Sequence, residues 1–74
     1  MDIISFGKIA EIAGGSFSID NAPDTDSLKK IIEQKFPALK GVKYLLAVDK
    51  KMIRGNINLD KNSVVALMPP FSGG

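Results

Sequence analysis

One segment of the chain has the apolar spacing of an amphipathic helix, and it leaves few folds open. Its apolar residues recur at i, i+3, i+4 and i+8, on one helical face: Leu28, Ile31, Ile32 and Phe36. Pro37 ends the segment and Thr25 or Asp26 can cap its start, so the pattern predicts a helix over residues 25–36. We interpret the stripe as core rather than as a cofactor-binding surface, because a single helix must bury it against a sheet.

The remaining apolar segments are short and have the patterns of β-strands. Strands are expected over residues 2–6, 16–19, 44–48, 52–53 and 64–68, with one or two helical turns over 8–13. This order predicts an α+β fold, a mixed sheet with one main helix packed on one face, in a single domain over residues 1–74. The expected core combines the stripe with alternate strand residues: Ile4, Phe6, Phe17, Ile19, Leu28, Ile31, Ile32, Phe36, Leu46, Val48, Val65 and Leu67.

The composition excludes several classes of chemistry. The 74 residues include no cysteine and no histidine, which removes thiol chemistry, histidine-activated nucleophiles and most metal sites. We therefore expect no metal site and no stably bound cofactor. Asp24 and Asp26 lie close together, but the start of a helix explains them without acid–base catalysis.

Charge and hydropathy give expectations about partners. The net charge is only +2, and most lysines lie in the second half of the chain. They indicate either a basic face for nucleic acid or solvated lysines on a helix and turns; we favour the second, because aromatic stacking partners are scarce. The apolar runs are far shorter than a membrane span and residues 1–6 do not resemble a signal peptide. We expect no nucleic-acid or membrane partner and a cytoplasmic location.

The last predicted strand is apolar on both faces. Val65 and Leu67 point one way, and Val64, Ala66 and Met68 point the other. One face should pack on the helix. The other is either an exposed patch for a partner or a surface covered by the chain's own loops.

A proline pair and two glycines follow this strand directly. Pro69 and Pro70 favour an extended backbone that leads away from the sheet. Gly73 and Gly74 have no side chains, so this segment can enter a channel that would reject a β-carbon. A frayed terminus or a cloning remnant is the alternative interpretation.

Three motifs carry a resemblance that covers essentially the whole chain. They are Phe6-Gly7-Lys8-Ile9-Ala10-Glu11, Leu46-Ala47-Val48 before a turn, and Val65-Ala66-Leu67-Met68-Pro69-Pro70-Phe71-Ser72-Gly73-Gly74. In these motifs the chain resembles the small subunits of molybdopterin synthase, which are ubiquitin-like β-grasp sulfur carriers. The resemblance implies a β-grasp domain with an exposed, flexible tail at residues 68–74.

The resemblance also implies a carrier cycle in molybdenum cofactor biosynthesis. An activating enzyme would use ATP to adenylate the carboxylate of Gly74, and a sulfur donor protein would convert it to a thiocarboxylate. Phe71, Ser72 and Gly73 would enter the active site of the synthase large subunit, where the sulfur passes to a pterin precursor, and Met68, Pro69 and Pro70 would contact the partner. The chain would be no enzyme by itself but a non-catalytic subunit.

Two alternatives remain open from the sequence. The same chemistry could serve thiamine synthesis, tRNA thiolation or protein conjugation, although the proline pair favours molybdopterin. A ubiquitin-like interaction module with an inert tail is the alternative of a different class.

Overall fold

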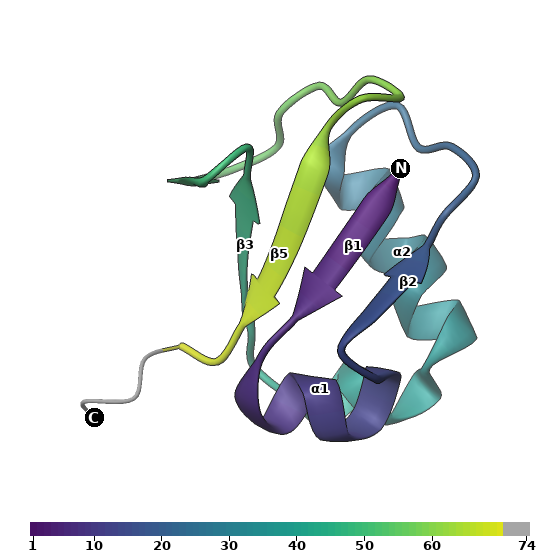
Figure 1. Cartoon of the computed structure of the whole chain (residues 1–74), viewed down its shortest axis with the longest axis vertical. Helices are drawn as coiled ribbons and strands as arrows, with labels where there is room; N and C mark the ends of the chain where they lie inside the picture. Colours follow the sequence, from purple (N-terminus) through teal and green to yellow (C-terminus); the bar gives the residue numbers. More distant parts are fainter. Residues whose placement is uncertain (71–74) are drawn as a thin grey trace.

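The computed structural model describes residues 1–70, which form one sheet and two α-helices (Figure 1). The elements follow one another as β1 (Asp2–Ser5), α1 (Gly7–Ala13), β2 (Ser16–Ser18), α2 (Thr25–Lys35), the 3₁₀ helix η1 (Pro37–Gly41), β3 (Leu45–Val48), β4 (Lys51–Met52) and β5 (Val64–Met68). All the predicted elements are present, with ends that differ by at most one residue.

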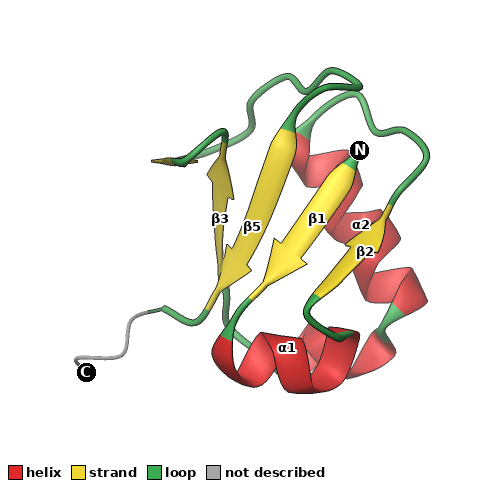
Figure 2. Ribbon diagram, viewed as in Figure 1, coloured by secondary structure: helices red, strands yellow, loops and turns green. Residues whose placement is uncertain are grey.

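The five-stranded sheet has the order β2-β1-β5-β3-β4, so the last strand lies in its centre. β5 pairs with β1 in parallel and with β3 antiparallel, while the two edge strands, β2 and β4, are antiparallel to their neighbours. The helix α2 covers one face and α1 lies across one end of the sheet (Figure 2). The expected α+β fold is therefore confirmed.

The core forms where the stripe of α2 meets the inward residues of the sheet. Leu28 and Ile32 are completely buried, and Ile31 and Phe36 are partly buried beside them. The ring of Phe36 meets that of Phe17 edge-on, with centroids 5.0 Å apart. Four buried residues from outside the predicted core also belong to this cluster: Ile3, Ile9, Ala22 and Leu39.

The predicted orientation of the first strand was wrong. Ile3 and Ser5 point into the core, with 0% and 4% of their surfaces exposed, whereas Ile4 is only partly buried and Phe6 is 48% exposed. The inward position of Ser5 is possible because its hydroxyl donates a hydrogen bond to the carbonyl of Gly14. The pairing of Ile3 with the buried Val65 of β5 sets the register, and register decides which face each side chain occupies.

Replacing either isoleucine of β1 by alanine tests this orientation. Ile3→Ala should lower the free energy of unfolding by about 2 to 5 kcal/mol, because it leaves a cavity in the core. Ile4→Ala, the matched control on the same strand, should cost clearly less. Denaturant unfolding gives both values, and a larger loss for Ile4→Ala would contradict the observed register.

The N-terminal end of α2 is capped by Asp24, not by Thr25 or Asp26 as the sequence suggested. The Asp24 Oδ1 accepts a hydrogen bond of 2.8 Å from the backbone N–H of Ser27. Hydrogen bonds from the Ser27 side chain and backbone, and then from the amide of Asn56, hold the pKa of the Asp24 carboxyl below its ordinary value of 3.8.

The segment that crosses from β4 to β5 is attached to the same helix end. The backbone N–H of Thr25 donates to the carbonyl of Ile57 at 2.9 Å, and the Thr25 hydroxyl accepts from the N–H of Ile57 at 3.0 Å. That hydroxyl also donates to Asn56 Oδ1, and Asn56 Nδ2 donates to Asp24. These bonds explain why Thr25 is buried although it is polar.

Asp24→Asn should alter the acid stability of the protein. The folded pKa of Asp24 is lowered, so its contribution is present above about pH 4 and is lost as the pH falls through the folded pKa. The asparagine keeps an acceptor for Ser27 but has no titratable charge, so in the acid range below about pH 4 the free energy of unfolding of the variant should fall less steeply than that of the original chain. Urea unfolding across this range checks the prediction, and identical slopes would contradict it.

Candidate functional site

The predicted reactive residue and the tail that carries it lie outside the described residues. Phe71, Ser72, Gly73 and Gly74 therefore keep their roles as predictions. The structure does place the base of the tail: Met68 ends β5, and Pro69 and Pro70 follow it.

The base of the tail lies between the start of α1 and the start of β3. The backbone N–H of Phe6 donates to the carbonyl of Leu67 at 3.0 Å, and Met68 pairs with Leu45 on the other side. Gly7 has φ +56°, and a β-carbon there would lie 3.1 Å from Cγ of Pro69, so the glycine leaves room for this ring. Figure 1 shows the chain leaving the sheet at the end of β5, next to α1.

The sheet face opposite α2 carries a group of apolar side chains, whereas β2 at its edge contributes Ser16 and Ser18. Ile4, Ala66, Ala47 and Met52 lie side by side across four strands, and Met68 and Leu45 form the next row. We call this surface the outer apolar face and define it by Ile4, Phe6, Leu45, Met52, Val64, Ala66 and Met68. Four of these side chains are exposed to solvent over about half of their surface or somewhat less: Met52 (53%), Phe6 (48%), Val64 (41%) and Leu45 (39%).

This face agrees in part with the exposed patch expected on the last strand. Val64 is exposed, whereas Ala66 and Met68 are half-buried among their neighbours in the sheet. Four contributors were not predicted on this face: Ile4, Phe6, Leu45 and Met52. The continuous apolar run of β3 was the available signal for Leu45, because a strand with apolar residues at every position has two apolar faces.

A positively charged hollow adjoins the outer apolar face. We call it the basic hollow; it is lined by Lys29, Glu33, Lys40, Lys43, Tyr44 and Pro70, together with Val42 and Leu45. The Tyr44 hydroxyl donates to Glu33 Oε2 at 2.7 Å, and Lys29 Nζ lies 5.5 Å from the centre of the Tyr44 ring. Burial, and then the bonded Glu33 carboxylate, raise the pKa of Tyr44 well above its ordinary value, so this phenol stays protonated and is no general base near neutral pH.

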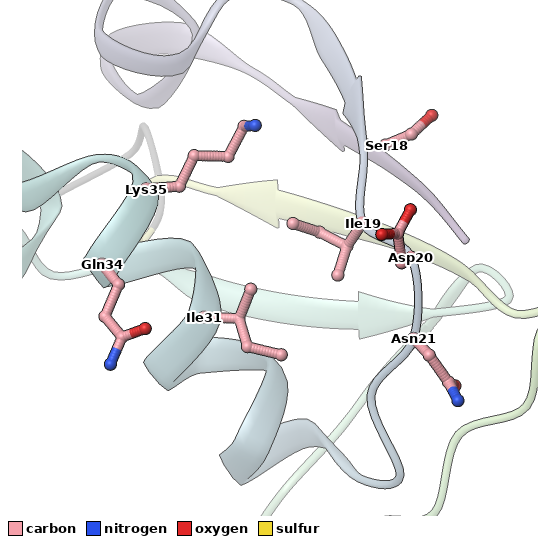
Figure 3. Close-up of a pocket in the computed structure, with 7 residues that line it drawn as sticks. All are labelled: Ser18, Ile19, Asp20, Asn21, Ile31, Gln34 and Lys35. Carbon is pink, nitrogen blue, oxygen red and sulfur yellow. The ribbon is translucent and has the colours of Figure 1, made fainter.

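A second hollow lies at the β2 edge of the sheet, between the end of β2 and α2. Figure 3 shows Ile19 and Ile31 between the end of β2 and α2, with Ser18, Asp20, Asn21, Gln34 and Lys35 around them. These polar groups do not converge on one point, so we assign this hollow no chemistry. Within residues 1–70, no group of three or more possible metal-binding side chains lies close enough to hold an ion, and no helix is long and apolar enough to cross a membrane.

Comparison with known proteins gives three consistent similarities. The model of the ThiS family matches residues 3–74. The chain is 29% identical to the molybdopterin synthase sulfur carrier subunit of Caenorhabditis briggsae, over 97% of this chain and 94% of that protein. It also superposes, with a TM-score of 0.72 and 31% identity, on a chain in the complex of subunits 1 and 2 of molybdopterin-converting factor from Helicobacter pylori, over 99% of this chain and 96% of that one.

Proposed function

The chain belongs to the ThiS family, and from this membership we propose that it is the sulfur carrier subunit of a molybdopterin synthase. The observation that carries the proposal is similarity over 97% of the chain to a relative of that name, together with a family match that extends through Gly73 and Gly74. The outer apolar face around the base of the tail supports it, because a carrier must dock on each partner that handles its terminus.

The proposed chemistry takes place at the carboxylate of Gly74. A carboxylate is a poor electrophile, so an activating enzyme first joins it to the AMP portion of ATP, releasing pyrophosphate. A sulfur donor protein then supplies sulfur to the carbonyl carbon and AMP leaves, which gives a thiocarboxylate. In the synthase the thiocarboxylate sulfur would form a carbon–sulfur bond to the pterin precursor and displace an oxygen leaving group from it. Water would then cleave the bond between this sulfur and the carbonyl carbon of Gly74, which leaves the sulfur on the pterin and restores the carboxylate.

The partners would supply every catalytic group in this cycle. The chain has no histidine or cysteine to act as base or nucleophile, and the one phenol stays protonated. Its own contribution is reach: the six residues after Met68 span roughly 20 Å when extended. Phe71, Ser72 and Gly73 would line the path of Gly74 into the large subunit, while Met68, Pro69 and Pro70 contact its surface.

Sulfur carriage for thiamine synthesis or tRNA thiolation uses the same tail chemistry. The named relative and the solved complex both belong to molybdopterin synthesis, which favours that pathway. Mixing the thiocarboxylated chain with the large subunit and the pterin precursor tests the choice directly: formation of molybdopterin supports the proposal, and sulfur retained on the chain would contradict it.

Met68→Asp should weaken binding to the large subunit at least about tenfold. An unpaired carboxylate buried in an apolar interface costs more than the roughly 1.4 kcal/mol that corresponds to this factor. Gln34→Asp, on the exposed side of α2, adds the same charge and should bind normally. Titration calorimetry gives both affinities, and thermal unfolding confirms that both variants are folded. Equal affinities would remove the outer apolar face from the interface.

Changes at the tail should abolish sulfur transfer while the fold is kept. One residue added after Gly74 displaces the carboxylate, and deletion of Gly74 shortens the reach by roughly 3.5 Å. That distance is large for reacting atoms that must be held within about 3 to 3.5 Å. Gly73→Val keeps the length but adds a branched side chain. Intact mass spectrometry, after incubation with activating enzyme, ATP and sulfur donor, follows the replacement of oxygen by sulfur, and a coupled synthase assay follows transfer.

Gly41→Val is the matched control for Gly73→Val. A β-carbon at Gly41 meets no atom within 4 Å, so this variant should be folded and fully active. A chain extended beyond Gly74 that still forms the thiocarboxylate and supports synthesis would leave the inert-tail module as the better interpretation.

A further inference from the structure

The basic hollow has no part in the chemistry at Gly74, yet it lies where the tail begins. Pro70, the second residue after β5, forms part of its wall. Leu45 belongs both to the hollow and to the outer apolar face. A protein that covered this face and received the tail would therefore extend over the hollow as well.

The charges of the hollow are unbalanced. Lys29, Lys40 and Lys43 are exposed and contribute three ammonium groups, against the single carboxylate of Glu33. That carboxylate already accepts the hydrogen bond of Tyr44 at 2.7 Å. Lys29 lies over the Tyr44 ring, which leaves Lys40 and Lys43 as the cations at the rim.

We propose that the basic hollow binds an acidic segment of the synthase large subunit, an inference that rests on the proposed function. Charge complementarity identifies the occupant: exposed lysines at the edge of an apolar interface match carboxylates on the facing surface. An acidic segment held there would contact Pro70 and so fix the direction in which the tail enters the partner.

Nucleic acid is the other class of polyanion that lysines attract, and the hollow is poorly suited to it. Among the described residues that line it, Tyr44 is the one aromatic ring; it is half-buried, bonded to Glu33 and covered on one face by Lys29, which leaves it poorly placed for a base to stack on. A protein carboxylate needs no ring to stack on.

Charge reversal at the rim tests the proposal through association kinetics. With purified large subunit at low salt, Lys40→Glu/Lys43→Glu should lower the association rate constant by about tenfold and change the dissociation rate constant much less. The difference should shrink as salt is raised. The matched control, Lys50→Glu/Lys61→Glu, makes the same change in net charge at exposed positions in the turns at the far end of β3 and β5, and should retain most of the original rate.

Five results would overturn the inference, and they are distinguishable. If both double variants associated equally slowly, the effect would come from net charge alone. If the original chain and both double variants associated at the same rate, neither pair of lysines would take part in binding. Lysine-dependent binding of a single-stranded RNA oligonucleotide, with large-subunit association unchanged, would identify the hollow as a nucleic-acid site. If the unmodified chain did not bind the large subunit, the proposed function would fail together with the inference; if it bound, and only Met68→Asp weakened binding, the inference alone would fail.

Discussion

The parallel pairing of β1 with β5 in the middle of the sheet is the interaction on which the other features depend. It sets the register that turns Ile3 and Val65 toward α2 and leaves Ile4 and Ala66 on the opposite face. The same alignment places the end of β5 beside the start of α1, where Pro69 lies against Gly7. Core, outer apolar face and base of the tail are thus consequences of one strand alignment.

The sequence was sufficient wherever the decisive interactions are local. The spacing of Leu28 and Ile32 follows from helix geometry alone, and Pro37 ends the helix for steric reasons that involve only its neighbours. The sequence was insufficient where the orientation of a side chain or the cap of a helix depends on a residue far away in the chain. Alternation along the first strand predicts Ile4 and Phe6 in the core, but the hydrogen bond from the Ser5 hydroxyl to the carbonyl of Gly14 makes an inward serine acceptable. The cap at Asp24 likewise belongs to a network with Asn56, which is far away in sequence.

The candidate site likewise has one part that could be predicted from the sequence and another that could not. The tail motif is contiguous, so its interpretation required no structure. The outer apolar face takes residues from four strands and the basic hollow takes them from α2, η1, β3 and the residues around them, so both became visible only once register and packing were fixed. The sequence favours solvated lysines over a nucleic-acid face but does not group Lys40 and Lys43 with Pro70, because that proximity depends on how β3 returns beside β5.

The central place of β5 has a consequence for how the molecule folds. Asp2 pairs with Val64, so two segments separated by nearly the whole chain must meet before the central strands of the sheet can pair. Contacts so distant in sequence slow folding, since the entropy of loop closure is lost before they form. Until β5 pairs between them, β1 and β3 expose unpaired backbone N–H and C=O groups that other chains can bind. The outer apolar face forms only when β5 has paired with β1 and β3, so a partner that binds this face selects molecules whose folding is complete.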